Sequence, residues 1–517
     1  MKGRILWVDD QIELLKSHVL FLKSKGYDVT TATNGNDALD LVREKDFHVV
    51  LLDEMMPGMD GLETLDKIKE IKNNLPAIMI TKNEEESLME KAMGNKIADY
   101  LTKPVNPSQI LMAIKKIIDM SRISSEHASK NYMEEFHQIS HRLYEDLEIK
   151  DWYDIYTKLA KWDLEFDEHP DLGLKETLED QVRDCNIEFA KYIEMNYKKW
   201  LKEDSHLRPI LSPDLMKHFV TPRLRKNEKI LFIVIDCLRL DQWFTIEPLL
   251  AEYFNIELNY YLSILPSATP YSRNAIFSSQ YPLELQETFS DIWNHAEDET
   301  SMNRYEEQML KDYFEREDII MGNGWEYIKV LDSKQGQKVE KKIKTLVEKN
   351  FLALVVNFVD ILAHRRSESD VIKEIVPDES SYRAIVRNWF RNSWIFSAIK
   401  YFREAGFKVV ITSDHGSIRV KKPVKVKGDK ETSSNIRFKY GRNLNISPKH
   451  ALVIKDHEEY KLPNHGVNTN YLIAKENFYF VYPTNYHKFE GHFRDTFQHG
   501  GLSMEEMILP LITLLPK

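Results

Sequence analysis

Three acidic side chains near the start of the sequence are of a type that can bind a metal ion and accept phosphate. Asp9 and Asp10 directly follow the apolar residues 5–8, and Asp53 follows the strand-like residues 48–52. Carboxylates that meet at one edge of a sheet repel each other unless a divalent cation neutralises them, and an oxygen-only site suits Mg²⁺. We therefore expect a magnesium site at which Asp53 is the nucleophile.

Thr81 and Lys103 follow two further apolar runs and complete this candidate site. Lys103 can hold a phosphoryl oxygen opposite the metal, and Thr81 can hydrogen-bond the new phosphate and be drawn toward it. Tyr100 is the aromatic side chain that could follow Thr81. Each aspartate alone could instead cap a helix, but the ordered set at successive strand ends favours phosphate chemistry.

Short β-rich runs alternate with amphipathic helical stretches through this region. Five βα units of this kind predict a doubly wound parallel sheet, in which ligands bind outside the carboxyl ends of the strands. The predicted strands cover residues 5–8, 28–31, 48–52, 77–80 and 98–101.

The string Leu-Asp-Glu-Met-Met-Pro-Gly-Met-Asp-Gly around Asp53, with a Lys-Pro pair after the fifth strand, resembles the CheY-like receiver family over residues 1–122. The resemblance implies that a sensor histidine kinase donates phosphate to Asp53. It also implies that the face formed by the fourth helix, fifth strand and fifth helix dimerises.

A second set of Asp, His and Thr residues lies at predicted strand ends in the C-terminal part of the chain. Two zinc ions about 4 Å apart need imidazole and carboxylate ligands and one hydroxyl nucleophile, which this set would supply. Taken singly, each residue could instead be a helix cap, a surface histidine or a core residue. The set consists of Asp236, Thr269, Asp360, His364, Asp414, His415 and His499.

The spacing within two pairs of this set suits metal binding. Asp360 and His364 follow the predicted strand 352–358 and can share one face of a turn or helix start. Asp414 and His415 end another predicted strand, where adjacent ligands can spread around a metal.

The order Asp, Thr, Asp-x-x-x-His, Asp-His-Gly and His-Gly-Gly resembles the alkaline phosphatase superfamily over residues 207–517. The strings Asp-Cys-Leu-Arg-Leu-Asp-Gln-Trp and Pro-Ser-Ala-Thr-Pro-Tyr-Ser-Arg resemble its PglZ-type branch. This resemblance implies that Thr269 is a metal-bound nucleophile. It implies two zinc sites, one formed by Asp236, Thr269, Asp414 and His415, the other by Asp360, His364 and His499.

Other polar residues beside Thr269 leave alternatives open. Ser267 and Ser272 are neighbouring hydroxyls that could also act as the nucleophile. Arg273 is either a phosphate contact or an ordinary ion-paired arginine.

A basic segment follows Asp414 and His415, in contrast to the overall net charge of −11. Basic side chains interleaved with aromatic ones suit a phosphate backbone with stackable bases, whereas a solvated loop is the ordinary explanation of a charge run. The candidate substrate contacts are Arg273, Lys425, Arg437 and Lys439. The basic residues of the segment are Arg419, Lys421, Lys422, Lys425, Lys427, Lys430, Arg437, Lys439 and Arg442.

Length and composition limit the possible classes of protein. The 517 residues predict two or three domains, and the acidic net charge argues against binding along duplex DNA. The two cysteines, Cys185 and Cys237, can form neither a disulfide framework nor a cysteine-rich zinc site. No export signal is visible and every apolar run is far shorter than the ~20 residues of a spanning helix, so we expect a cytoplasmic protein without membrane insertion.

The residues between 123 and 206 have apolar side chains at helical spacing, in three stretches. No helix-turn-helix pattern occurs there, which argues against a DNA-binding output. The predicted bundle either transmits the state of the receiver and widens a dimer interface, or is a passive spacer.

The complete arrangement, with a receiver at 1–122, a helical linker at 123–206 and a PglZ-type domain at 207–517, resembles the PorX response regulators. The fold class implied is a multidomain α/β protein. The function implied is a two-component response regulator whose zinc phosphodiesterase acts on short oligonucleotides and controls type IX secretion and gliding. The partners implied are a sensor histidine kinase, a second copy after phosphorylation, and a secretion or gliding motor or a sigma factor.

Two other functions stay open for the C-terminal domain. It could be a zinc-stabilised scaffold that docks partners with little or no catalysis. It could also be a phosphomonoesterase, sulfatase or phosphomutase, because these activities share the metal site and differ in the substrate pocket.

Overall fold

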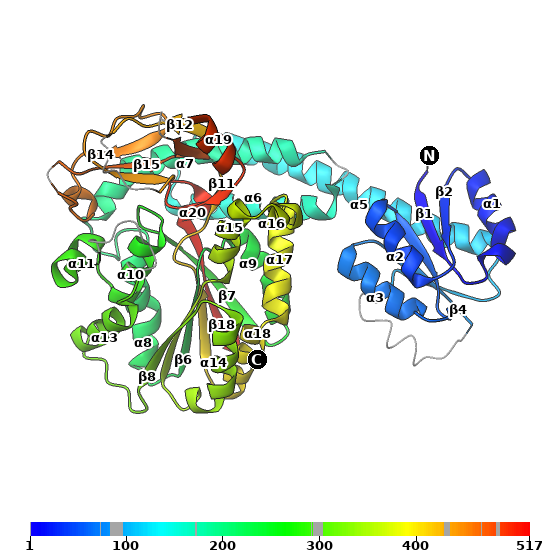
Figure 1. Ribbon diagram of the computed structural model, residues 1–517, viewed down its shortest axis with the longest axis horizontal. Helices are drawn as coiled ribbons and strands as arrows, with labels where there is room; N and C mark the ends of the chain where they lie inside the picture. The colour runs from blue at the N-terminus through cyan, green and yellow to red at the C-terminus, as the bar shows by residue number, and fades with distance from the viewer. Residues whose placement is uncertain are drawn as a thin grey trace. The chain divides into compact units, whose positions relative to one another are not determined.

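The computed structural model describes residues 2–72, 74–82, 97–170, 173–290, 292, 303–428, 435–466, 468–481 and 486–517 (Figure 1). It divides into two compact units. The receiver unit comprises Met1–Glu135 and Glu168–Leu172, and the output unit comprises Phe136–Asp167 and Gly173–Lys517. Among the described helices, none is both long and apolar enough to cross a membrane.

The receiver unit is built on a five-stranded sheet in the order β2-β1-β3-β4-β5, with all strands parallel. Successive residues of β1 alternate between two cores, Ile5 and Trp7 on one face of the sheet and Leu6 and Val8 on the other. Helices therefore cover both faces, and the predicted doubly wound sheet is confirmed. The strands are β1 (Arg4–Val8), β2 (Asp28–Ala32), β3 (Val49–Asp53), β4 (Ala77–Thr81) and β5 (Asp99–Thr102). The helices are η1 (Ile12–Leu15), α1 (Lys16–Ser24), α2 (Gly35–Glu44) and α3 (Gly61–Ile71).

Three long helices cover the predicted helical middle at 123–206, and the first of them begins within the predicted receiver. They are α5 (Pro107–Arg142), α6 (Ile149–Glu168) and α7 (Lys175–Trp200). The buried face of α6 includes Trp152, Ile155 and Leu159, at the spacing that the sequence indicated. Most of α6 and all of α7 belong to the output unit, so these helices pack as part of that unit.

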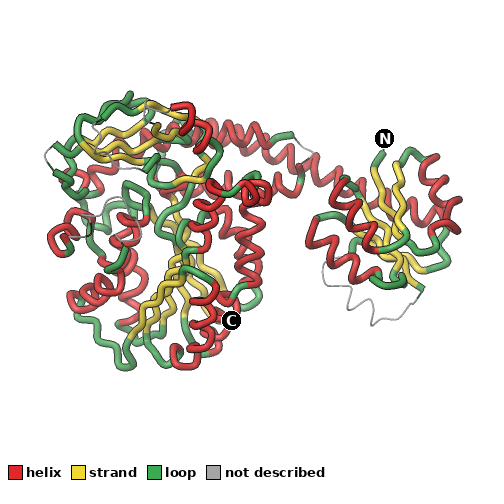
Figure 2. Tube along the Cα trace, in the orientation of Figure 1, coloured by secondary structure: helices red, strands yellow, loops and turns green. Residues whose placement is uncertain are grey.

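The output unit is centred on a six-stranded mixed sheet in the order β7-β18-β10-β6-β9-β8, flanked by helices (Figure 2). The central strands β6 and β9 are completely buried, which explains their continuous apolar sequences. Strands β8, β9, β6 and β10 are parallel, whereas β18 is antiparallel to both of its neighbours. The strands are β6 (Ile230–Ile235), β7 (Phe254–Leu262), β8 (Trp325–Val330), β9 (Phe351–Val356), β10 (Lys408–Thr412) and β18 (Ile508–Pro516).

The predicted strand at 352–358 ends earlier than expected. Strand β9 ends at Val356, and helix α15 begins at Phe358. The other helices of the unit are η3 (Ser212–Asp214), η4 (Met216–Val220), α8 (Thr221–Leu224), α9 (Leu240–Leu250), α10 (Thr269–Ser278), α11 (Pro282–Thr288), α13 (Glu306–Arg316), α14 (Ser333–Leu346), α15 (Phe358–Glu368), α16 (Asp370–Ile375), α17 (Glu379–Asn392) and α18 (Trp394–Glu404).

Smaller β elements lie together near one end of the main sheet (Figure 2). Strand β15 pairs antiparallel with β13 and β14, β12 pairs with β16, and β11 pairs with β17. Their bounds, with those of the adjacent helices, are β11 (Ile418–Arg419), β12 (Lys422–Lys425), β13 (Phe438–Gly441), β14 (Ala451–Ile454), η6 (Glu458–Tyr460), β15 (Asn470–Ala474), β16 (Phe478–Val481), α19 (Tyr486–Phe493), β17 (Phe497–Gln498) and α20 (Met504–Met507).

Candidate functional site

The receiver unit brings its three predicted acidic residues together at the carboxyl ends of β1 and β3. Ligand atoms of Asp9, Asp10 and Asp53 all lie within 4.8 Å of one another. The Lys103 ammonium lies 2.9 Å from Asp53 Oδ2 and 3.1 Å from Asp9 Oδ2. Burial raises the pKa of the Asp53 carboxyl above its ordinary value, with the charges of Asp9 and Asp10 adding to the effect and Lys103 opposing it. A divalent cation would relieve this repulsion.

The start of helix α3 passes close to the backbone of Asp53. A Cβ atom at Gly61 would lie 2.3 Å from the carbonyl oxygen of Asp53, so only glycine fits there. The Thr81 hydroxyl donates a hydrogen bond to Glu54. Tyr100 is partly buried against the core on one face of the sheet. The predicted fourth helix follows Thr81 and lies outside the described residues, so the dimerisation face that includes it stays a prediction.

The output unit gathers its predicted ligands at the carboxyl ends of β6, β9 and β10. Asp236 follows β6, Asp414 and His415 follow β10, and ligand atoms of these three residues lie within 4.8 Å of one another. His415 Nε2 is 3.5 Å from Asp236 Oδ1, 3.8 Å from Asp414 Oδ2 and 2.8 Å from the Thr269 hydroxyl. This first cluster is buried.

A second cluster adjoins the first and is more open. Asp360 and His364 lie one turn apart on α15, and His499 completes the group. Asp360 Oδ1 is 3.3 Å from His364 Nε2 and 3.6 Å from His499 Nε2. The rings of His415 and His499 stack with their centroids 4.2 Å apart, which joins the two clusters. The side chain of His364 is 45% exposed, so this cluster faces solvent.

Several polar atoms in these clusters suit a metal ion better than a hydrogen-bonded core. Asp236 Oδ1, Asp414 Oδ2 and Asp360 Oδ1 are buried without a hydrogen-bond partner. Buried polar atoms are normally paired, so unpaired oxygens that face imidazole nitrogens indicate ligand positions. His415 Nδ1 lies 3.1 Å from the Gly416 carbonyl, which orients the ring so that Nε2 faces the Thr269 hydroxyl and the two carboxylates.

The protonation of the buried histidines fits the same interpretation. Burial lowers the pKa of His415 to about 4 and that of His499 to about 3. Both imidazoles are therefore neutral near pH 7, the form that binds metals. Burial and the nearby charge of Asp236 raise the pKa of Asp414 well above its ordinary value, as expected for two facing carboxylates.

The structure distinguishes among the three hydroxyls near the start of α10. Thr269 is the first residue of that helix, and its hydroxyl contacts His415. The Ser267 hydroxyl donates to the carbonyl oxygen of Gly501, and the Ser272 hydroxyl is paired with that of Ser263 at 2.7 Å. Both serine hydroxyls have partners outside the clusters, whereas the Thr269 hydroxyl contacts a cluster residue.

Arg273 is held inside the protein by carboxylates. Its guanidinium lies 2.5 Å from Asp236 Oδ2, 2.5 Å from Glu306 Oε1 and 3.6 Å from Asp414 Oδ2, and the residue is 1% exposed. Of the two alternatives open in the sequence, the geometry favours the ion-paired arginine. Asn357, which donates to Asp236 Oδ2 at 2.7 Å, and Glu306 were not singled out in the sequence, because neither belongs to a motif.

The basic segment forms a smaller basic surface than expected. Arg437 is fully buried, and its guanidinium binds the Glu506 carboxylate at 2.5 Å. It lies so close to Gly501 that a Cβ there would meet it at 2.1 Å. Lys439 is 1% exposed and donates to the Asn435 carbonyl oxygen at 2.8 Å. The prediction of substrate contacts at these two positions is therefore corrected, because both side chains point inward.

Four lysines of the segment remain exposed, and one member cannot be placed. The exposed lysines are Lys421, Lys422, Lys425 and Lys427. Lys430 lies outside the described residues.

Lys439 provides a test of this burial. Burial lowers the pKa of its ammonium to about 7, whereas an unfolded lysine keeps its proton to about pH 10.4. Unfolding therefore takes up a proton between these values, and the free energy of unfolding rises with pH by up to about 1.4 kcal/mol per unit. We expect Lys439→Met to be more stable than the wild type at pH 7, with an advantage that shrinks by pH 9 in urea denaturation. An advantage independent of pH would show that Lys439 keeps its proton in the folded protein.

Three family models match this chain in the order that the structure shows. The response regulator receiver domain matches residues 5–115, and the PorX response regulator linker domain matches residues 122–201. The BREX system PglZ alkaline phosphatase-like domain matches residues 215–514.

Individual relatives match the receiver part. The transcriptional regulatory protein CpxR homolog of Haemophilus influenzae is 36% identical over 129 residues, which are 25% of this chain and 55% of that protein. This chain thus spans about half the length of that relative. A CheY-like receiver domain from Methanospirillum hungatei is 31% identical, covers 23% of this chain and 94% of its own, and has a TM-score of 0.22. Response regulator TrrA of Thermotoga maritima, solved with Mg²⁺ and BeF, is 29% identical over 22% of this chain and 97% of its own, with a TM-score of 0.21.

The fold and the site define a response regulator with a phosphoesterase-type output domain. The chain belongs to the PglZ alkaline phosphatase-like family, whose model spans more than half of its 517 residues, and has the architecture of a PorX-type response regulator. A receiver domain implies phosphotransfer from a sensor kinase.

Proposed function

We propose that the output domain is a zinc-dependent phosphodiesterase for short oligonucleotides, controlled by phosphorylation of Asp53. The observation that carries this proposal is the pair of Asp and His clusters at one sheet edge, with the Thr269 hydroxyl 2.8 Å from His415 Nε2. A scaffold that only docks partners would not need a hydroxyl directed at these ligands.

The donor set divides between two metal positions. Asp236, Thr269, Asp414 and His415 would hold one zinc, and Asp360, His364 and His499 the other. Bound zinc would lower the pKa of a hydroxyl and stabilise charge on the attacking and leaving oxygens of an in-line displacement.

The chain itself prepares Thr269 to attack a phosphate. As the first residue of the ten-residue helix α10, Thr269 lies at the positive end of the helix dipole, which favours a developing alkoxide. The Thr269 hydroxyl lies 2.8 Å from His415 Nε2, so both groups can reach the same metal position. Arg273 holds Asp236 in place and offsets part of the negative charge of the first cluster.

The exposed lysines beyond His415 support a polyanionic substrate. Lys421, Lys422, Lys425 and Lys427 follow the first cluster in a chain with a net charge of −11. Such a local excess of positive charge favours a phosphate backbone over an uncharged substrate.

The receiver half of the proposal assigns a role to each residue of its site. Asp9, Asp10 and Asp53 would bind Mg²⁺, Asp53 would accept the phosphoryl group, and Lys103 would neutralise it. Thr81 would exchange its bond to Glu54 for one to the phosphate. We further propose that the phosphorylated protein dimerises in the cytoplasm and controls type IX secretion and gliding, through a motor or sigma factor partner.

Replacement of Asp53 tests the receiver assignment. With acetyl phosphate and Mg²⁺, we expect the wild type to become phosphorylated and Asp53→Asn to remain unlabelled, because an amide cannot form the acyl phosphate that the Asp53 carboxylate would form. Phosphate-affinity electrophoresis measures the difference, with Asp60→Asn, whose carboxylate caps α3, as the control that should still be labelled. Full labelling of Asp53→Asn would overturn the assignment.

Metal analysis with a hydrolysis assay tests the output domain. We expect about two zinc ions per chain and hydrolysis of a chromogenic phosphodiester that a chelator abolishes and zinc restores. Faster cleavage of a phosphomonoester would instead assign the site to monoesters. A protein without bound metal and without turnover would be a scaffold.

A further inference from the structure

Helices α6 and α7 are connected, through two separate sets of polar contacts, to segments that carry four of the seven proposed metal ligands. We call these segments the ligand loops, and they comprise residues 236–241, 414–419 and 497–501. Both sets of contacts lie within the output unit, and neither contains a metal ligand.

The first set of contacts starts on α6 and passes through two buried arginines. Arg383, on α17, binds Asp163 and Asp167 of α6 and also lies 3.0 Å from Asp241 Oδ2. Asp241 in turn accepts from Arg239 Nε at 2.9 Å. Both arginines are at least 96% buried, so breaking one of these pairs leaves an uncompensated charge in the interior.

Arg239 touches all three ligand loops. It lies three residues after Asp236, its Nη1 is 3.4 Å from the Ser417 carbonyl oxygen, and its guanidinium lies 5.6 Å from the centre of the Phe497 ring. Ser417 and Phe497 are each two residues from a histidine of the clusters. The position of Arg239 therefore bears on both metal positions.

The second set of contacts starts on α7 and passes through α20. The Asn186 side chain accepts from the Met504 backbone at 2.8 Å and donates to Glu505 Oε2 at 3.0 Å. Next to it, the Glu506 carbonyl accepts from Gly416, and the Glu506 carboxylate accepts from Gly501 at 2.8 Å. A Cβ at Gly416 would lie 1.9 Å from the Glu505 carbonyl oxygen, so α20 sits directly against this loop.

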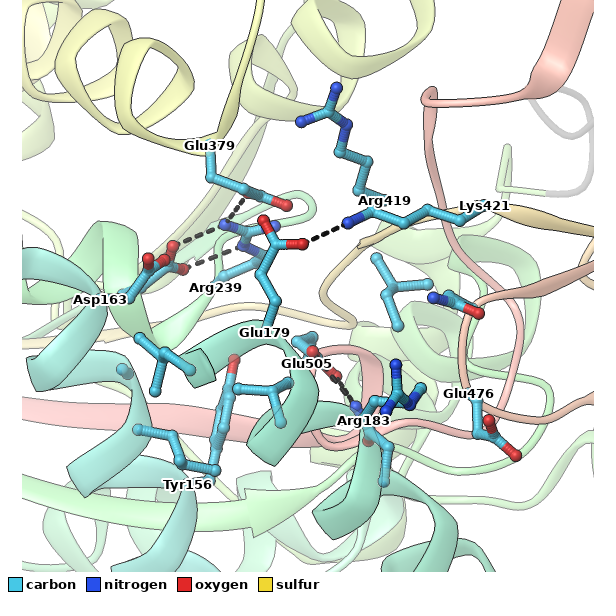
Figure 3. A pocket seen from close by; sticks show the side chains of 18 of the residues that line it. Tyr156, Asp163, Glu179, Arg183, Arg239, Glu379, Arg419, Lys421, Glu476 and Glu505 are labelled. Carbon is cyan, nitrogen blue, oxygen red and sulfur yellow. Dashed lines mark hydrogen bonds and ion pairs between the residues drawn. The ribbon is translucent and has the colours of Figure 1, made fainter. Parts of the chain in front are cut away.

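A cavity of about 140 Å³ separates the two sets of contacts (Figure 3). Its walls are Tyr156 of α6, Leu178 and Asn186 of α7, and Arg239 and Glu505 of the opposite side. The lining thus includes residues of both sets of contacts, which places the two sets beside one pocket between α6, α7 and the ligand loops.

Both helices are also bound to the last turns of α5. Arg142 of α5 lies 2.6 Å from carboxylate oxygens of both Asp151 and Asp154 on α6. Gln181 of α7 donates to the Phe136 carbonyl oxygen of α5 at 3.0 Å. A displacement of α5 would therefore act on α6 and α7 together.

We propose that α6 and α7 position the metal ligands through Arg383 and Asn186, and that the receiver controls hydrolysis through these contacts. The inference deepens the proposed function and rests on it. Under this inference the helical middle transmits the state of the receiver, which is one of the two roles that the sequence left open. Arg239, Arg383 and Asn186 are positioning residues, because they act on the ligands through other groups.

The test uses the full-length protein with two independent changes. Asp163→Asn combined with Asp167→Asn removes the charges that bind Arg383, and Asn186→Ala removes the contacts to α20. Glu188→Gln is the matched control, because it breaks an exposed ion pair with Lys191 that lies within α7 itself. Melting temperature shows whether each variant is folded.

The readouts are metal affinity, the visible absorption spectrum of the Co²⁺-loaded protein, and kcat and KM for a chromogenic phosphodiester. Loss of a group that orients metal ligands typically lowers affinity or activity about 10- to 100-fold. We expect losses of that size in affinity and kcat, a changed Co²⁺ spectrum and an unchanged KM for both changes, with the control within twofold of the wild type.

Three other outcomes are decisive. If both variants kept the metal affinity and the Co²⁺ spectrum of the wild type, the inference would be overturned and the proposed function would stand. Equal losses in Glu188→Gln would also overturn it, because the effect would then be general destabilisation of α7. A wild type that binds neither Co²⁺ nor Zn²⁺ would overturn the proposed function itself.

Discussion

Thr269→Ala is expected to lower kcat for a chromogenic phosphodiester by roughly 10⁴-fold or more, the size of loss seen when a catalytic nucleophile is removed. The physical reason is that the Thr269 hydroxyl alone of the three hydroxyls around the start of α10 contacts His415. Carboxylate and imidazole ligands remain in the variant, so bound metal should persist. Steady-state kinetics with metal analysis of the same samples measures both quantities.

Two control variants make this result specific. Thr269→Ser keeps a hydroxyl at the same position and should retain substantial activity. Ser272→Ala removes a hydroxyl that pairs with Ser263, and should retain wild-type kcat with a small loss of stability. If Ser272→Ala were inactive and Thr269→Ala active, the nucleophile would have to be reassigned.

Arg273→Gln is expected to cause the largest loss of stability. The guanidinium compensates carboxylates of Asp236, Asp414 and Glu306 that are at most 1% exposed. Removing one partner from a buried ion pair costs roughly 3–5 kcal/mol, which for a unit of this size corresponds to a fall in Tm of about 5 °C. Differential scanning calorimetry of the metal-free protein measures the change.

Two controls accompany this prediction: the same Tm measurement in excess zinc, and a variant of the neighbouring Lys329. Excess zinc should narrow the difference in Tm, because a bound cation also neutralises Asp236 and Asp414. Lys329→Met removes a partly exposed cation from the same Glu306 and should cost about 1 kcal/mol or less. If Arg273→Gln raised KM and left Tm unchanged, Arg273 would be the phosphate contact that the sequence also allowed.

The receiver fold could be predicted from the sequence because the pattern that specifies each strand lies within a few consecutive residues. Each strand of the sheet is a short apolar run, and alternate residues such as Ile5 and Leu6 enter the cores on opposite faces. The strand ends then place Asp9 and Asp53 at one edge, since parallel strands share the direction in which they end.

The metal-ligand set could be proposed from the sequence for a similar reason, although its surroundings could not. Asp236 and Asp414 follow buried strands, and their order along the chain forms a recognisable pattern. Glu306 and Asn357 escaped notice because their roles depend on contacts with Arg273 and Asp236, which lie 33 and 121 residues away.

The basic segment shows where sequence reasoning fails. In the sequence, Arg437 and Lys439 look like Lys425, as members of one charged run. In the structure, strand β13 packs against the loop after His499, and the partner of Arg437 is Glu506, 69 residues further on. Burial of a charge depends on such a distant partner, so a local count of charges cannot reveal it.

The sequence by itself determined the receiver sheet, the acidic site at its edge and the types of residue that can bind metal in the output domain. These depend on strand periodicity and on which side chains follow each strand. Only the tertiary structure decided which hydroxyl faces the clusters, which arginines are interior counter-ions, and that α6 and α7 pack into the output unit. These features arise from contacts between residues far apart in the chain, whose partners are fixed only when the elements pack together.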